Sequence, residues 1–152
     1  MGNDIAGDRV RDMMELIADT AGVDADVEIH DDPDGLTAEY VGDDLAVLIG
    51  HHGETIDAIQ HLAYRIAARG DEPRVSVVVD AAGYRDRRAQ SLRQTADQAA
   101  AAALREGRPV ALEAMNALER KVIHEHLKGR RDLETYSEGQ EPSRHLVVAP
   151  VV

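Results

Sequence analysis

Apolar side chains return at the spacing of one helix face along the first part of the chain, which predicts a helix over Ile5–Ala21. Gly22 follows at the place where such a helix ends. Two short apolar runs come next, with a turn rich in Pro, Asp and Gly between them. They predict a β-hairpin whose strands are Val27–Ile29 and Leu36–Val41.

The next helical pattern is interrupted by the short sequence Gly-His-His-Gly at residues 50–53. Leu45–Ile49 predicts a short turn of helix before the interruption, and Glu54–Ala68 resumes the helical spacing after it. A β-branched run at Arg74–Val79 then predicts a third strand. The expected order of this half is therefore helix, strand, strand, helix, loop, helix, strand.

The remaining residues predict a second region that again mixes helices and strands. Helical spacing covers Tyr84–Arg105 and Ala114–Lys128. Short apolar runs predict three strands, at Val110–Leu112, Leu133–Ser137 and His145–Ala149. With Asp80–Gly83 as the boundary, we expect an α+β protein of two domains, residues 8–80 and 84–152, the second with a three-stranded sheet.

The composition limits how these domains are built. The 152 residues include no Phe, Trp or Cys, so the cores must be aliphatic, and disulfides and thiolate metal sites are excluded. Acidic residues near Met1 do not fit a secretory signal, and no apolar run approaches the length that spans a membrane. We expect a soluble cytoplasmic protein without membrane insertion.

Charge is divided unevenly between the two halves. Residues 1–80 contain 5 Lys and Arg against 19 Asp and Glu, whereas residues 81–152 contain 12 against 10. The net charges are therefore −14 and +2. Because contacts to phosphate need cations, a nucleic-acid site is expected to draw its charge mainly from the second half.

A Gly-x-x-Gly sequence between two helices is typical of a loop that clamps a nucleic-acid backbone. Gly50 and Gly53 have no side chains to keep the backbone away, and the helix that begins near Glu54 directs free N–H groups toward phosphate. Three neighbouring apolar residues are predicted to line a groove for unstacked bases: Ile49, Ile56 and Ile59.

A second pattern, Arg-x-x-x-His, places Arg120 and His124 four residues apart and hence on one helix face. Lys121 flanks them, and Lys128 lies one further turn along. A permanent cation beside an imidazole that binds phosphate or stacks on a base is a reasonable contact for single-stranded nucleic acid.

The element order over Asp8–Asp80 resembles the bacterial, type II, KH domain, and Leu48–Gln60 is similar to the version found in the Jag family. Family members usually carry Lys or Arg in the centre of the loop, where this chain has His51 and His52. Histidine is mostly neutral at pH 7, and Glu54 repels phosphate. We therefore expect weak backbone binding by this half, or binding strengthened by a partner protein.

The stretches Met115–Glu125 and Glu134–Arg144 also resemble the Jag family, in its Arg-x-x-x-His single-strand-binding domain, and residues 84–88 match the start of its long helix. The resemblance and the motifs together imply two sets of RNA contacts. In the KH half these are Ile49, Gly50, His51, His52, Gly53, Thr55, Ile56 and Ile59. In the second half they are Arg85, Arg87, Arg88, Arg120, Lys121, His124, Lys128 and Arg144.

The resemblance implies a non-catalytic bacterial protein that binds single-stranded RNA, with single-stranded DNA as the alternative ligand and with no cofactor or metal. It further implies a post-transcriptional regulator or RNA chaperone linked to cell-envelope growth and division. The expected partner is a KH-only protein or a second copy of the chain. The separate N-terminal segment of some relatives is expected to be missing, since the first helix begins within ten residues of Met1.

Two other functions were weighed against RNA binding. Metal-dependent catalysis is disfavoured because His124 and His126 lie two residues apart on a helix and diverge, and no His-Glu-x-x-His pattern occurs. Neither His51 and His52 with Glu54 nor Ser137 with a histidine has the spacing of a catalytic site. The second alternative is a protein-interaction adaptor whose acidic KH half serves dimerisation.

Overall fold

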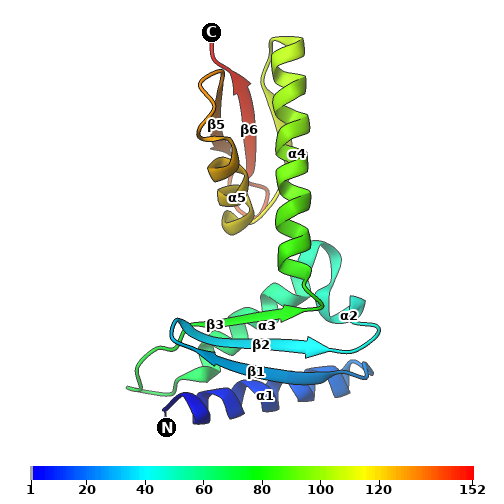
Figure 1. Cartoon of the computed structure of the whole chain (residues 1–152), viewed down its shortest axis with the longest axis vertical. Coiled ribbons are helices and arrows are strands. Elements are labelled where there is room, and N and C mark those ends of the chain that lie inside the picture. The colour runs from blue at the N-terminus through cyan, green and yellow to red at the C-terminus, as the bar shows by residue number, and fades with distance from the viewer. Residues whose placement is uncertain (1) are drawn as a thin grey trace. The chain divides into compact units, whose positions relative to one another are not determined.

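The computed structural model describes residues 2–152, and side chains from Asp4 onward. The chain divides into two compact units, Met1–Arg85 and Asp86–Val152, which are described separately (Figure 1). Each unit has its own three-stranded sheet and its own apolar core. This confirms the expected two-part α+β fold.

In the first unit, two antiparallel strands and one parallel strand form a sheet of order β1-β2-β3. The elements are α1 (Gly2–Thr20), β1 (Asp26–Asp32), β2 (Gly35–Val41), α2 (Ala46–Ile49), the 3₁₀ turn His51–Gly53, α3 (Glu54–Ala67) and β3 (Val77–Ala81). Helices α1 and α3 contact each other, and Figure 1 shows both beside the sheet. Their order is the one that the hydrophobic pattern predicts.

The first core is aliphatic, with one buried tyrosine. Val10 and Met14 of α1 and Ile56 of α3 pack against the alternate residues of the sheet that face them. The hydroxyl of Tyr40 donates a hydrogen bond of 2.7 Å to the carbonyl of Met14, and burial raises the pKa of Tyr40 to about 12. This bond ties the central strand to α1 at a place that water does not reach.

The second unit has a sheet of order β4-β6-β5, antiparallel throughout. Its elements are the C-terminal part of α4 (Tyr84–Glu106), then β4 (Val110–Ala114), α5 (Ala117–Leu127), β5 (Leu133–Glu138) and β6 (His145–Pro150). The alanine-rich stripe of α4 lets it pack closely on this core, where Ala96, Ala100 and Ala103 are fully buried. Ile123 of α5 and Val148 of β6 complete the contact.

Several element boundaries differ from the sequence-based expectation, among them the starts of β3 and α5. The third strand begins at Val77 and not at Arg74, and its register with β2 starts at the pair of Val77 with Leu36. Helix α5 begins at Ala117 and not at Ala114. The side chain of Asn116 accepts the N–H of Glu119 at 2.9 Å and so caps the helix, while Ala114 pairs in the sheet.

None of the helices within residues 2–152 combines the length and the apolar character that crossing a lipid bilayer requires.

Candidate nucleic-acid interfaces

The clamp loop, residues 50–53, requires a glycine at both ends. Gly50 and Gly53 have φ values of 76° and 79°, in the region that side chains disfavour. A Cβ on Gly50 would lie 2.9 Å from the backbone nitrogen of Thr55, and one on Gly53 would lie 2.5 Å from the hydroxyl oxygen of Tyr84. The two glycines are therefore fixed by packing inside the unit, whatever the loop binds.

Both central residues of the clamp loop are exposed histidines. His52 has a φ of 52°, and the His51 and His52 rings stack with centroids 3.9 Å apart. Glu54, the first residue of α3, is exposed beside them. Neutral imidazoles can donate hydrogen bonds or stack on a base, but they add no permanent charge to offset the carboxylate of Glu54.

The predicted apolar groove beside the clamp loop is largely part of the core. Ile56 is fully buried and Ile59 is 3% exposed, whereas Ile49 and Thr55 are partly exposed. The role of these residues in base binding stays a prediction. In this structure Ile49 is the one of the three isoleucines whose side chain reaches the surface.

The second unit has an open groove between α5 and β5, which we call the basic groove. It is lined by Ala117, Arg120, Lys121, His124, Thr135, Tyr136, Ser137, Arg144 and Leu146. Three permanent cations are among these residues, and no carboxylate is. Lys121 and His124 are exposed, and Nδ1 of His124 lies 2.5 Å from Oγ1 of Thr135, which orients the imidazole.

Arg120 lies in the floor of the basic groove and is not a freely solvated cation. It is 8% exposed, and its guanidinium donates to the carbonyl oxygen of Met115 and, at 2.6 Å, to the carboxylate of Glu141. Arg144 is partly exposed and donates to the carbonyl of Gly139 at 2.6 Å. Arg120 therefore holds the loop that leads from β5 back to Arg144.

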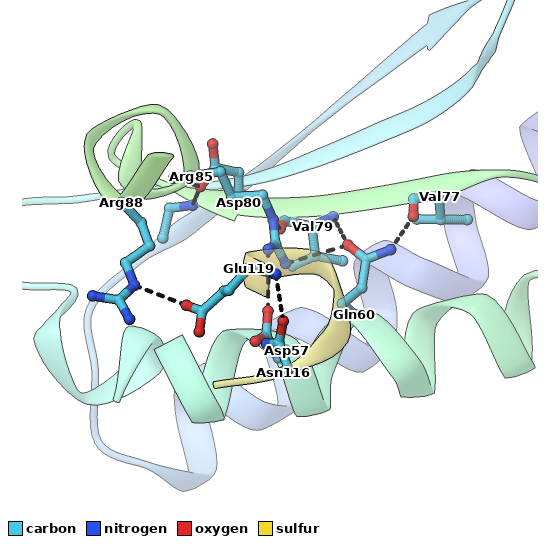
Figure 2. A network of polar contacts seen from close by, with 10 residues as sticks. Asp57, Gln60, Val77, Val79, Asp80, Arg85, Arg88, Asn116 and Glu119 are labelled. Carbon is cyan, nitrogen blue, oxygen red and sulfur yellow. Dashed lines mark hydrogen bonds and ion pairs between the residues drawn. The ribbon is translucent and has the colours of Figure 1, made fainter. Parts of the chain in front are cut away.

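The remaining predicted cations also have partners inside the protein. Arg85 lies 3.1 Å from the carboxylate of Asp57, and Arg88 lies 2.8 Å from that of Glu119 (Figure 2). Lys128 lies 3.0 Å from Glu125, and its hydrogen bond lowers the pKa of that carboxyl.

Arg87, the last of the predicted cations, is exposed. The structure thus places Arg120, Lys121, His124 and Arg144 along one groove, whereas Lys128 and the three predicted arginines of α4 are not in its lining. Their contacts with RNA stay predictions.

Sequence reasoning missed the contribution of β5 to this groove. Thr135, Tyr136 and Ser137 line it from the strand, and Tyr136 is 40% exposed. The sequence contained a signal for these three residues, since they belong to the stretch Glu134–Arg144 that carries the family resemblance. Hydroxyl and aromatic groups beside cations suit single-stranded nucleic acid, because they bond to base edges and stack on base faces.

Within the described residues, one group of side chains has metal-ligand chemistry. Glu28, His30 and Glu39 of the β1-β2 hairpin place one ligand atom each within 4.8 Å of one another. Glu28 and His30 are exposed, and Glu28 and Glu39 are directly opposite in the strand pair, where like charges repel. Exposed acidic groups of this kind are common without a metal, so the group is not evidence of a metal site.

Comparison with known proteins finds a known domain in each unit. Residues 8–79 match the KH domain of KhpA and KhpB, and residues 90–150 match the R-three-H domain, the domain with Arg-x-x-x-His. A fold of this kind, with a clamp loop in one unit and a basic groove in the other, defines a protein with a KH domain followed by an R-three-H domain. The recognition of the Jag family is confirmed: the chain joins the KH domain of KhpA and KhpB to an R-three-H domain, and the relatives that it matches are named KhpB.

Three relatives show how far the similarity extends. The "RNA-binding protein KhpB" of Clostridium symbiosum is 32% identical over 144 residues, which are 93% of this chain and 65% of that protein. The protein of the same name in Lactiplantibacillus plantarum is 34% identical over 97% of this chain and 46% of its own length. The protein of this name in Bacillus subtilis is 32% identical over 90% of this chain and 66% of its own length. The chain thus spans from about half to two thirds of the length of these relatives.

Proposed function

We propose that the chain binds single-stranded RNA without catalysis, and that the basic groove supplies the main contact. The observation that carries the proposal is the lining of this groove, in which Lys121 and Arg144 lie beside an oriented His124 with no carboxylate among the lining residues. Cations attract the phosphates, while the imidazole and the phenol ring offer surfaces for unpaired bases. Relatives named RNA-binding proteins support the choice of ligand.

The clamp loop supplies a second, weaker contact in this proposal. It places two exposed histidines, His51 and His52, at the start of α3, whose free N–H groups suit a phosphate, but histidine does not supply the permanent charge of lysine or arginine. Single-stranded RNA that reaches both units would gain affinity from the clamp loop without depending on it. We further propose a cytoplasmic role as a post-transcriptional regulator or RNA chaperone linked to envelope growth and division.

The experiment is a titration of a fluorescent single-stranded RNA with the full chain at several salt concentrations. We expect binding that weakens with salt, and a loss of at least tenfold in the double variant Lys121→Ala with His124→Ala. Arg108→Ala is the matched control, because Arg108 is an exposed cation of the same unit that pairs with Glu106 and lies outside the groove.

Equal affinities for the double variant and Arg108→Ala would refute the basic groove as the main site. Parallel titrations with double-stranded RNA and single-stranded DNA test the ligand class. If no nucleic acid binds while the chain self-associates, the adaptor alternative replaces the proposal; the acidic first unit would then be its interaction surface.

A further inference from the structure

The first two residues of α4 pack back onto the first unit, although they lie beyond the region that matches the KH domain, residues 8–79. The chain leaves β3 at Ala81 and turns through Ala82 and Gly83, both with positive φ. The carboxylate of Asp80 accepts the N–H of Ala81 at 2.8 Å and that of Arg85 at 3.2 Å, which closes this turn. Tyr84 and Arg85 are thereby brought to the clamp loop and to α3.

Tyr84 fills the space directly behind the clamp loop. The position that a Cβ of Gly53 would take lies 2.6 Å from Cε1 of the Tyr84 ring, and Tyr84 packs against the first core. Gly53 is buried by this contact on one side, while His51 and His52 are exposed on the other. A ring in van der Waals contact behind the loop limits how far the loop can move away from a bound phosphate.

Arg85 connects α3 to the open edge of β3. Its Nε donates to the carbonyl of Val79 at 2.7 Å, and its Nη1 lies 3.1 Å from the carboxylate of Asp57 (Figure 2). Gln60 completes the network, since its amide donates to Val77 and accepts the N–H of Val79 at 2.5 Å. The Arg85 guanidinium also donates to Oε1 of Gln60 at 3.5 Å, so three partners on α3 and β3 hold it.

Arg85 matters for RNA binding because it lies beside the carboxylate of Asp57. Asp57 and Glu54 are the acidic residues of the first turn of α3, the turn whose free N–H groups border the clamp loop. A carboxylate repels a phosphate at that place, and the guanidinium of Arg85, 3.1 Å away, offsets the charge of Asp57. The pair is about one third exposed, so the offset is screened but not abolished.

We propose that Tyr84 and Arg85 are positioning residues of the clamp loop, so that the working KH clamp of this chain extends through Arg85. Tyr84 supports the loop from behind, and Arg85 neutralises Asp57 and fixes α3 to β3. The inference rests on the proposed function, because it concerns how the clamp loop accepts phosphate. Arg85 then acts on the clamp loop through Asp57 and α3, and not by direct contact with RNA.

A double-variant cycle on the full chain tests whether Arg85 acts through Asp57 or contacts RNA directly. Arg85→Ala is expected to weaken binding of a single-stranded RNA by about fivefold, since Asp57 then repels phosphate. Adding Asp57→Asn should restore most of the affinity. Arg93→Ala removes the same charge from an exposed position of α4 and should change affinity little. If the double variant stays as weak as Arg85→Ala, Arg85 contacts RNA directly and its positioning role is wrong.

Hydrogen exchange in the free protein tests Tyr84 without any RNA. We expect the amides of Gly53 and Glu54 to exchange at least threefold faster in Tyr84→Ala and at the wild-type rate in Tyr84→Phe, which keeps the ring. Unchanged exchange in Tyr84→Ala would overturn the support role. Failure of the wild-type chain to bind RNA would instead refute the proposed function, so the two failures can be told apart.

Discussion

In the first unit, Arg9, Arg11 and Arg74 lie against groups of the same unit, whereas in the second unit Lys121 and Arg144 line an open groove. Arg9 is 2.8 Å from Glu72, Arg11 is 3.7 Å from Asp8, and Arg74 lies over the ring of Tyr64. Lys121 is exposed in the basic groove, with no carboxylate among the lining residues. In the first unit a phosphate would therefore meet mainly the backbone of the clamp loop, and in the second unit it would meet mainly cationic side chains.

This difference explains how an acidic protein can bind a polyanion. Affinity for phosphate depends on the local field at the site more than on the total of −12, because charges beyond about a Debye length are screened. The clamp loop and the basic groove thus make separable contributions to RNA affinity. The clamp loop contributes through its geometry, and the basic groove contributes through its charge. A substitution can therefore change one contribution to RNA binding and leave the other in place.

The largest effect is expected from Arg120→Ala in the second unit. The variant leaves the carbonyl of Met115 without its guanidinium donor and releases Glu141, so the unit should lose about 2 kcal/mol of stability. RNA affinity should fall as well, because the loop that carries Arg144 loses its anchor. Urea denaturation and RNA titration measure the two effects.

Lys121→Ala is the neighbouring control for that experiment, since Lys121 is exposed and its loss should leave stability unchanged. A stable Arg120→Ala protein whose salt dependence flattens by about one phosphate contact would show that Arg120 is a direct phosphate ligand, as the sequence suggested.

The second prediction tests the charge of the basic groove alone. Lys121→Glu should lower RNA affinity by more than the tenfold, or about 1.4 kcal/mol, expected for Lys121→Ala, because the new carboxylate repels phosphate. The slope of log K against log salt should flatten by about 0.7 for the lost contact to a single strand. Filter binding between low and moderate salt measures both. An affinity for Lys121→Glu equal to that of wild type would contradict the division of roles between the two units.

The third prediction attempts to give the first unit the charge that it lacks. His51→Lys places a permanent cation at an exposed position of the clamp loop, so RNA affinity should rise by about threefold and its salt dependence should steepen. His51→Ala removes the same ring and its stacking on His52 without adding charge, and serves as the control. If both variants bind as wild type does, the clamp loop does not hold phosphate.

Periodicity predicted which elements form, because the cores are built from apolar stripes that the sequence displays directly. Ile56 and Ile59 illustrate the limit of this approach, because helical spacing fits both the core positions in which they lie and the groove positions predicted for them, and it cannot separate the two. Strand limits depend on the partner strand, as the pairing of Leu36 with Val77 shows. The identity of the partner strand cannot be read from the residues near the strand end.

The chemistry of individual arginines was harder to predict than the fold. The partner of Arg120 is 21 residues away and that of Arg85 is 28 residues away, so no spacing rule reveals either. A capping signal was present in the sequence, since Asn116 precedes Glu119 by three residues as in a helix cap, and it locates the start of α5 correctly. The capping rule could thus have corrected the predicted start at Ala114, whereas the long-range ion pairs required the fold.

The smallest effect concerns the acid stability of the first unit. Hydrogen bonds from Arg9 and from the backbone of Arg69 lower the pKa of Glu72 to about 2 from an ordinary value of 4.5. A folded pKa below the unfolded one means that the pair stabilises the unit above about pH 4.5, and that this contribution is lost as pH falls from there toward 2. Glu72→Gln should therefore lower Tm slightly at pH 7.

The difference in Tm between wild type and Glu72→Gln should shrink as the pH falls from about 4.5 toward 2, because the unfolded state takes up its proton before the folded carboxylate does. Asp132→Asn is the matched variant in the second unit, where Arg130 lowers the pKa of Asp132 in the same way. Neither variant should alter RNA binding at pH 7, since neither residue lines the basic groove or belongs to the clamp loop. A gain in affinity for Glu72→Gln would mean that releasing Arg9 provides the first unit with a phosphate ligand, and that its arginines are withheld from RNA only by their ion pairs.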